Sequence, residues 1–270
     1  MEKYTYNDIK NKILYLRKSQ NDVVSNFIPL MDSGNDDNYE GFSTDKSIVF
    51  LHEEGRTRRA TFFSGDRSEL IYLLSLLPKG IAADYIARSE TVDDDFMLKA
   101  GFRKKGLLER ISFPDIQQEK EILLQDPQFK ALYDNGDFCD VEYAVTGDEY
   151  EIYKNLSEIF NIYVDHLETE KEILAHIEKK GIIICRKDYG IAALEIYNIH
   201  GSKMEITNVF NKDNYRVMCA LDVKIREIAR ENSVKYMYTF VDLYNERAVR
   251  YHNRRNAIFE KFYNHIYAKE

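Results

Sequence analysis

Residues 204–256 contain the series of elements that most constrains the fold of this chain. Residues 204–210 (MEITNVF) combine β-branched and aromatic residues in a short run that favours a strand, and a polar loop follows at 211–214. The next segment spaces its apolar residues by three and four, as on one face of a helix: Met218, Leu221, Ile225 and Ile228. A second strand at 235–241 and a second helix after Asn245 complete the series. A strand that enters a helix through a short loop directs free backbone N–H groups at that loop, so this end can hold an anion such as a diphosphate.

Composition and charge limit the class of protein. A chain of 270 residues can form one large domain or two small ones. The net charge of −8 argues against a nucleic-acid-binding face, which needs a basic patch. No apolar run reaches the roughly 18 residues of a membrane span, and the N-terminus has no signal-peptide pattern, so we expect a cytoplasmic protein.

Neither the cysteines nor the histidines have the spacing of a metal site. The three cysteines are isolated at Cys139, Cys185 and Cys219, without CxxC spacing, which disfavours structural zinc and a disulfide framework. The six histidines show no HxxxH or HxxE spacing. We therefore expect no metal.

The order of the remaining elements predicts an α/β protein with a mixed sheet, built from two halves. In the first half, residues 1–114, we expect one or two helices at 5–29, a loop at 33–44 and a hairpin at 47–52 and 57–64. A helix at 68–77 that Ser68 could cap, a strand at 81–86, a helix at 91–100 and a strand at 106–113 follow. A charged segment at 115–138 predicts a helical connector.

The second half, residues 139–270, repeats the same kinds of element. We expect a strand at 141–145, helices at 148–160 and 168–180, and a hairpin at 181–186 and 190–199. The series at 204–256 and an aromatic strand at 257–267 complete it.

The series at 204–256 resembles the core of the GNAT superfamily of acyl-CoA N-acyltransferases. In that family a central strand leads through a glycine-containing loop into a helix, and the next strand ends near an Asn. The sequence Phe-Met-Leu-Lys-Ala-Gly-Phe at 96–102, followed by a strand, resembles the closing part of the same fold. The resemblance implies two GNAT-like domains in tandem, with a shortened, degenerate N-terminal one at 1–114 and an acyltransferase domain at 139–270.

The resemblance also implies that acetyl-CoA, or another acyl-CoA, is the co-substrate. The residues that match the cofactor-binding positions are Val209, Phe210, Asn214, Tyr215, Arg216, Val217, Met218, Cys219 and Asn245. The chain departs from the family pattern because residues 214–220 contain no glycine, the residue that lets a backbone close around a phosphate. Asn245 is explained equally well as the N-cap of a helix.

Two residues are candidates for acid–base chemistry. Glu205 lies on the central strand, where two-residue alternation places it on one face with Thr207 and Val209, and some family members carry a general base there. Tyr251 lies beside the family's general-acid position, and a one-residue shift of the alignment would place His252 there instead. The structural alternatives are an exposed strand residue for Glu205 and a packing role for Tyr251.

These observations predict an acyl-CoA-dependent N-acetyltransferase that acts on an unidentified primary amine, in a small molecule or a peptide. A non-catalytic GNAT-fold binding protein is the first alternative, favoured by the missing glycines. A relative that takes its acyl group from aminoacyl-tRNA is the second, and the acidic charge balance argues against it. Aromatic strand edges make a homodimer possible.

Overall fold

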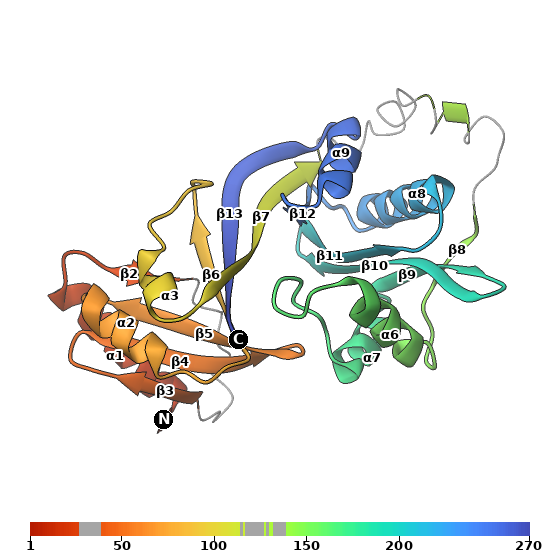
Figure 1. The fold of residues 1–270 in the computed structure, drawn as a ribbon. Helices are drawn as coiled ribbons and strands as arrows, with labels where there is room; N and C mark the ends of the chain where they lie inside the picture. The colour runs from red at the N-terminus through yellow and green to blue at the C-terminus, as the bar shows by residue number, and fades with distance from the viewer. Residues whose placement is uncertain (27–38, 114–115, 117–126, 128–129, 132–138) are drawn as a thin grey trace. The chain divides into compact units, whose positions relative to one another are not determined.

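A computed structural model describes residues 1–26, 39–113, 116, 127, 130–131 and 139–270 (Figure 1). The chain divides into two compact units. Unit 1 comprises Met1–Leu107, Ile162–Leu167 and Phe262–Glu270, and unit 2 comprises Leu108–Asn161 and Glu168–Lys261. Each unit therefore draws on more than one stretch of the chain. Among the described residues, no helix is long and apolar enough to cross a membrane.

Unit 1 is a sheet whose strands follow the order β1-β3-β4-β5-β6-β13, with β2 beside β5. Its strands are β1 (Glu2–Tyr4), β2 (Val24–Ser25), β3 (Tyr39–Ser43), β4 (Ser47–Glu54), β5 (Thr57–Ser64), β6 (Ile81–Ala87) and the end of β13 (Ile258–Lys269). Its helices are α1 (Tyr6–Ser19), α2 (Arg67–Ser75) and α3 (Asp95–Lys99). Strands β5 and β6 are parallel, as a crossover through α2 requires.

Local sequence explains the helices of unit 1. Thr5 and Asp8 form a reciprocal capping box that satisfies free backbone donors at the start of α1. The buried side chains of α1 are Ile9, Ile13 and Leu16, which are spaced by four and three residues. They pack against Ile48, Phe50 and Phe63. Helices α2 and α3 contribute to a second apolar cluster that contains Phe62, Phe96 and Tyr267.

Three local expectations for unit 1 were wrong. Residues 39–43, expected within a loop, form the strand β3, which pairs with β4 from Glu40↔Leu51 to Ser43↔Ile48. Asp66 caps α2 in place of Ser68, because its carboxylate accepts hydrogen bonds from the backbone N–H groups of Ser68 and Glu69. Helix α1 ends at Ser19, and the strand β2 follows at Val24–Ser25 in place of further helix.

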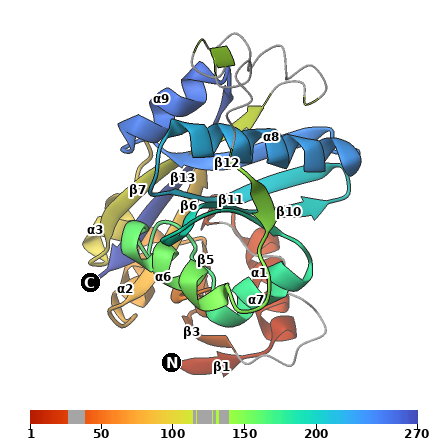
Figure 2. The ribbon, with the colours of Figure 1, turned by 90° about the vertical axis from the view of Figure 1, so that its right-hand side faces the viewer.

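Unit 2 is a sheet in the order β7-β12-β11-β10-β9-β8. Its strands are the end of β7 (Arg103–Phe113), β8 (Val141–Tyr143), β9 (Ile182–Lys187), β10 (Gly190–His200), β11 (Lys203–Asn211) and β12 (Tyr236–Asp242). Its helices are α6 (Glu149–Ile159), α7 (Glu170–Glu178), α8 (Tyr215–Glu231) and α9 (Glu246–Arg254). Figure 2 shows α8 and α9 on one side of this sheet and α6 and α7 on the other.

The two long strands pair outside the half of the sequence in which they lie. Strand β7 follows α3 in the chain, but it pairs antiparallel with β12, from Met237↔Phe113 to Asp242↔Leu108. Strand β13 follows α9, but it pairs antiparallel with β6, from Tyr263↔Ala87 to Lys269↔Ile81. The predicted domains 1–114 and 139–270 follow the order of elements along the sequence. They stay a prediction. The predicted connector at 115–138 falls almost entirely outside the described residues.

Candidate active site

The centre of unit 2 is the point where β11 and β12 separate. These parallel strands pair only from Lys203↔Tyr236 to Ile206↔Thr239. Beyond that point β11 continues beside β10 as far as Asn211, and β12 continues beside β7 as far as Asp242. The Thr239 hydroxyl donates a 2.7 Å hydrogen bond to the Ile206 carbonyl and closes the paired end. The two strands therefore part at the end of the sheet where α8 and α9 begin.

A β-bulge at Thr207 sets which side chains face this opening. Strand β10 pairs Ile196 with Asn208 and the next residue, Tyr197, with Ile206, so Thr207 is an extra residue on β11. A bulge interrupts the two-residue alternation of side chains. Ile206 and Val209 consequently line the same cavity, whereas Glu205 does not. The expectation that Glu205, Thr207 and Val209 share one face was wrong, because it assumed an unbroken strand.

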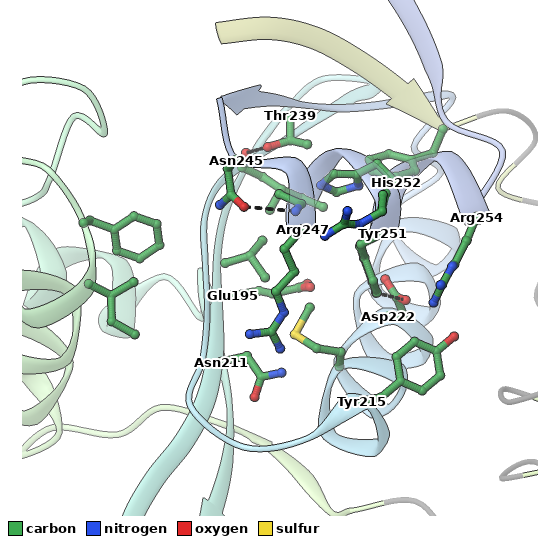
Figure 3. A pocket seen from close by; sticks show the side chains of 18 residues that line it. Glu195, Asn211, Tyr215, Asp222, Thr239, Asn245, Arg247, Tyr251, His252 and Arg254 are labelled. Carbon is green, nitrogen blue, oxygen red and sulfur yellow. Dashed lines mark hydrogen bonds between the residues drawn. The ribbon is translucent and has the colours of Figure 1, made fainter. Parts of the chain in front are cut away.

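A cavity of about 550 Å³ occupies the opening, a size typical of small-molecule sites. Its apolar wall includes Ile206, Val209 and Met218, and Phe160 at the end of α6 also lines it. Figure 3 shows the polar side chains that line it, from β10, α8 and α9. The space is therefore bounded by both layers of helices and by the parted strands.

The predicted cofactor loop at the start of α8 is ordered by its own side chains. The Asn214 side chain accepts a 2.9 Å hydrogen bond from the Arg216 backbone N–H, and the Asn211 side chain accepts one of 2.9 Å from the Asp213 N–H. One of the amide donors at the α8 N-terminus is thus already occupied.

Some predicted cofactor residues line the cavity and others do not. Those that line it are Val209, Tyr215, Met218 and Asn245. Those that do not are Phe210, Asn214, Arg216, Val217 and Cys219, of which Val217 and Cys219 lie on the buried face of α8. Asn245 is the N-cap of α9, and its side chain accepts a 3.1 Å hydrogen bond from the Ala248 N–H.

Helix α9 supplies positive charge from residues that are not among the predicted cofactor-binding positions. Arg247, Arg250 and Arg254 all line the cavity, and their spacing by three and four residues places them on one face of the helix. Arg250 is paired with Glu246 at 3.2 Å. Arg247 and Arg254 form no ion pair within the part of the chain that the structure describes, and both side chains are exposed. The spacing of the arginines was visible in the sequence as a signal for an anion-binding face.

A buried polar network lies beneath the arginines. The Tyr251 hydroxyl donates a short hydrogen bond to the Asp222 carboxylate, and the Arg255 guanidinium lies 3.2 Å from the same carboxylate. Burial, followed by the charge of Asp222, raises the pKa of Tyr251 well above its ordinary value. Arg255 also donates to the Tyr215 hydroxyl at 3.0 Å. The hydroxyl proton of Tyr251 is therefore held in a hydrogen bond to Asp222.

Two cavity residues have pKa values shifted towards their uncharged forms. Glu195 on β10 is 2% exposed, and its Oε2 has no hydrogen-bond partner among the described residues. Burial, followed by the charge of Asp222, raises the pKa of Glu195 well above its ordinary value. Burial and the nearby Arg226 and Arg255 guanidinium groups lower the pKa of His252 to about 4. Sequence analysis missed Glu195, because nothing local distinguishes it from any strand carboxylate.

The two predicted catalytic residues are in different surroundings. Tyr251 lines the cavity, whereas Glu205 lies opposite Tyr238 in the β11–β12 pairing. Burial and then the Glu205 carboxylate raise the pKa of Tyr238 to about 12. The roles assigned to Glu205 and Tyr251 stay predictions. The described residues contain no group of three or more His, Cys, Asp or Glu side chains that could hold a metal ion.

Comparisons with known proteins support the fold. The sequence matches no known protein-family profile and no curated protein. Three similar solved structures have TM-scores above 0.5. A GCN5-related N-acetyltransferase from Sphaerobacter thermophilus has a TM-score of 0.55 at 14% identity, over 83% of this chain and 76% of its own. A tandem GNAT protein from the clavulanic acid biosynthesis pathway has a TM-score of 0.52 at 9% identity, over 98% and 96%. A conserved protein of unknown function from Staphylococcus epidermidis has a TM-score of 0.55 at 11% identity, over 89% and 96%.

These likenesses establish the architecture of the chain. It has the fold of the GCN5-related N-acetyltransferases, and the fold class predicted from the sequence, with its resemblance to the GNAT superfamily, is confirmed. Identities of 9–14% show the fold alone, so the chemistry has to be argued from the cavity of unit 2.

Proposed function

We propose that the protein binds an acyl-CoA in the cavity of unit 2 and transfers the acyl group to a primary amine. The observation that carries this proposal is the parting of β11 and β12, which opens a cavity with cationic side chains at its exposed rim and apolar side chains along its wall. Coenzyme A has a matching polarity, because it joins a phosphate-rich nucleotide to a thin pantetheine chain. The proposed acceptor is a small-molecule amine or a peptide.

The residues fit this co-substrate in a particular way. The α8 N-terminus lacks glycine, and Asn214 occupies one of its amides, so backbone donors alone make a limited phosphate site. Arg247 and Arg254 offer guanidinium groups with no carboxylate partner among the described residues, and guanidinium binds phosphate in a bidentate manner. In this proposal the arginines of α9 hold the diphosphate and the 3′-phosphate, and Ile206, Val209 and Met218 contact the pantetheine chain.

The acid–base roles inferred from the resemblance belong to this proposal. Glu205 would assist deprotonation of the amine, and Tyr251, or His252 under the shifted alignment, would protonate the departing thiolate. If the roles implied by the resemblance hold, Glu205→Gln and Tyr251→Phe would each lower turnover by a factor of about 10² to 10⁴ while acetyl-CoA affinity stays nearly unchanged. Full activity of Tyr251→Phe together with an inactive His252→Ala would assign the role to His252.

Calorimetric titration with acetyl-CoA tests the proposed site directly. Arg247→Glu and Arg254→Glu should each weaken binding by about one to a few kcal/mol, because each replaces an attractive charge by a repulsive one beside a phosphate. Lys235→Glu is the matched control: it makes the same change of charge at an exposed position between α8 and β12, outside the cavity lining. Equal affinities for the two arginine variants, the control and the parent would remove the cavity as the binding site.

A non-catalytic binding protein with the GNAT fold is the second candidate. The glycine-free loop, the capped amide at Arg216 and the engaged proton of Tyr251 favour it, since each removes a feature that acyl transfer would use. The titration with acetyl-CoA, combined with an assay of thiol release, decides between the acyltransferase and the non-catalytic binding protein. Tight binding of acetyl-CoA without release of free thiol in the presence of amines would identify a binder, and no binding at all would exclude both the co-substrate and the acyltransferase.

A further inference from the structure

The floor of the unit 2 cavity contains a carboxyl group that the fold leaves without a partner. Glu195 lies opposite Val209 in the β10–β11 pairing, next to the bulge at Thr207, and it faces the cavity rather than the outside of the sheet (Figure 3). Its side chain is 2% exposed, and Oε2 accepts and donates no hydrogen bond among the described residues. A buried polar atom without a partner costs about 1–3 kcal/mol, so an unpaired carboxyl in a cavity points to a group that arrives with the ligand.

The hydroxyl groups that line the cavity already donate hydrogen bonds to other protein groups. Tyr251 donates to Asp222, and Thr239 donates to the Ile206 carbonyl. Tyr215 donates to the Cys219 sulfur and accepts from Arg255.

The remaining proton carriers are unsuitable as acids. His252 has a pKa lowered to about 4, so at neutral pH its imidazole is uncharged and has no imidazolium proton to donate. The guanidinium groups of α9 hold their protons at all ordinary pH values. Among the described residues that line the cavity, Glu195 is the one carboxyl group without a hydrogen-bond partner, because Asp222 accepts from Tyr251.

The arginines of α9 and Glu195 lie at different depths in the cavity, and this difference sets how a bound thioester would be oriented. The arginines of α9 are exposed at the rim, whereas Glu195 is buried at the floor. A linear molecule held by its phosphates at the rim therefore directs its reacting end towards the floor. This places the sulfur of the thioester, and not the nucleotide, nearest to the Glu195 carboxyl.

We propose that Glu195 is the general acid that donates its proton to the thiolate that leaves during acyl transfer, in place of Tyr251. This inference rests on the proposed acyl-CoA function. The amine nitrogen forms a bond to the thioester carbonyl carbon, and the carbon–sulfur bond breaks. The sulfur takes the electron pair of that bond and the proton of Glu195. The amine nitrogen, positively charged after its attack, loses one proton as the amide forms, and the Glu195 carboxylate takes up this proton directly or through water, so protons and charge balance over one turnover. Burial raises the pKa of Glu195 and so favours the protonated form that this step needs.

The test compares Glu195→Gln with Tyr251→Phe in the full-length protein. Glutamine keeps the shape of the side chain and can form hydrogen bonds, but it has no acidic proton. Release of free thiol from acetyl-CoA is followed with hydroxylamine as acceptor, because it is small and uncharged at pH 7, and acetyl-CoA affinity is measured by calorimetry. Glu227→Gln is the matched control: it makes the same chemical change on α8 outside the cavity lining, where Glu227 pairs with Lys224 at 3.3 Å.

We expect Glu195→Gln to lower the rate of thiol release by a factor of about 10² to 10⁴ with acetyl-CoA affinity changed less than about threefold. Tyr251→Phe should lose less activity than Glu195→Gln, and Glu227→Gln should retain the parental rate. The parental rate should also fall as pH rises through the raised pKa of Glu195, and this fall should be absent from the residual rate of Glu195→Gln. A purely structural role of Glu195 would not remove that dependence on pH.

The outcomes separate this inference from the proposed function. An active parent with a fully active Glu195→Gln variant overturns the role of Glu195 and leaves the acyltransferase intact. An active parent that Tyr251→Phe disables while Glu195→Gln does not identifies Tyr251 as the acid. A parent that binds no acetyl-CoA, or binds it without accelerating thiol release, overturns the proposed function and the role of Glu195 with it.

Discussion

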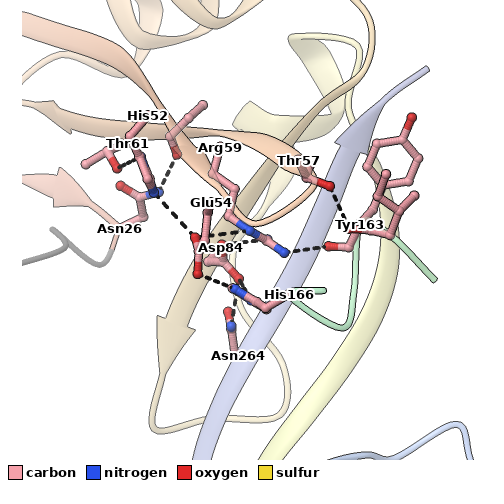
Figure 4. Close-up of polar contacts among 12 residues, drawn as sticks. Asn26, His52, Glu54, Thr57, Arg59, Thr61, Asp84, Tyr163, His166 and Asn264 are labelled. Carbon is pink, nitrogen blue, oxygen red and sulfur yellow. Dashed lines mark hydrogen bonds and ion pairs between the residues drawn. The ribbon is translucent and has the colours of Figure 1, made fainter. Parts of the chain in front are cut away.

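Replacing His166 by asparagine should destabilise the protein at pH 6 and have a much smaller effect at pH 10. His166 lies in unit 1, between two carboxylates (Figure 4): its Nδ1 is 2.5 Å from Glu54 Oε1, and its Nε2 is 3.2 Å from Asp84 Oδ1. Arg59, which is 1% exposed, contacts both carboxylates, at 3.2 Å and 2.8 Å. Since a carboxylate faces each ring nitrogen, the imidazole is stable here as the doubly protonated cation.

The size of the effect follows from the pKa of His166. Burial acts to lower the pKa, but the charge of Asp84 and the hydrogen bonds to both carboxylates raise it to about 9 from 6.5. At about 1.4 kcal/mol for each pH unit, this rise corresponds to about 3 kcal/mol. The side chain is 33% exposed, so solvent screening reduces the contribution to about 1–2 kcal/mol.

The sign of the pH dependence is fixed by the direction of the shift. A group whose pKa is raised on folding contributes its full stability below its unfolded pKa, here 6.5, and loses it as pH rises through its folded pKa, here about 9. The difference in free energy of unfolding between the parent and His166→Asn should therefore shrink by about 1–2 kcal/mol between pH 6 and pH 10. Asparagine is the suitable replacement because His166 has a positive φ of 48°, which asparagine tolerates.

Urea unfolding of the full chain, followed by far-ultraviolet circular dichroism at pH 6, 8 and 10, measures this difference. His176→Gln is the control: burial lowers the pKa of His176, so its contribution changes only below pH 6.5 and should be flat from pH 7 upwards. A difference for His166→Asn that stays constant from pH 6 to pH 10 would refute the reasoning. Equal stability of the variant and the parent at pH 6 would do so as well.

Three further predictions concern the other polar groups. Arg216→Glu should weaken acetyl-CoA binding by about one to a few kcal/mol in calorimetry if the α8 N-terminus contacts the diphosphate; unchanged affinity, with binding intact in the parent, would exclude that contact. Glu195→Gln should raise the unfolding free energy relative to the parent as pH increases above about 4.3, because a carboxyl with a raised pKa loses its contribution as pH rises; no gain at pH 8 over pH 4 in urea melts would contradict this. Asn26→Ala should cost about 1–3 kcal/mol in the same melts, because the buried Asn26 amide bonds the Ala60 carbonyl and the Phe62 N–H at 2.8 Å each; a loss below about 0.5 kcal/mol would count against it.

The core of unit 2 was predictable because its signals are local. The expected strands at 204–210 and 235–241 correspond to β11 (Lys203–Asn211) and β12 (Tyr236–Asp242), and α8 begins at Tyr215 directly after the polar loop. Each of these elements is encoded by side-chain spacing over fewer than about 20 residues, the range in which periodicity is informative. The hairpin of β9 and β10 was found for the same reason.

The missed features depend on residues that are distant in the sequence. Strand β3 has little apolar character of its own, and it forms because it pairs with β4 on one side and β1 on the other. The bulge at Thr207 appears only in the register between β10 and β11, and it decides that Val209 and not Glu205 lines the cavity. Two-residue alternation carries no information about a residue inserted into one strand.

The sequence by itself determined the order of elements and the fold class, because both follow from the spacing of side chains along single segments. Only the tertiary structure decided that β7 pairs with β12 and β13 with β6, and that the cavity opens where β11 leaves β12. It also decided the chemistry of Glu195, whose side chain is an ordinary carboxylate in the sequence. Burial under α8 beside Asp222 raises the pKa of that carboxyl group, and burial is a property of the packed chain, not of any segment of it.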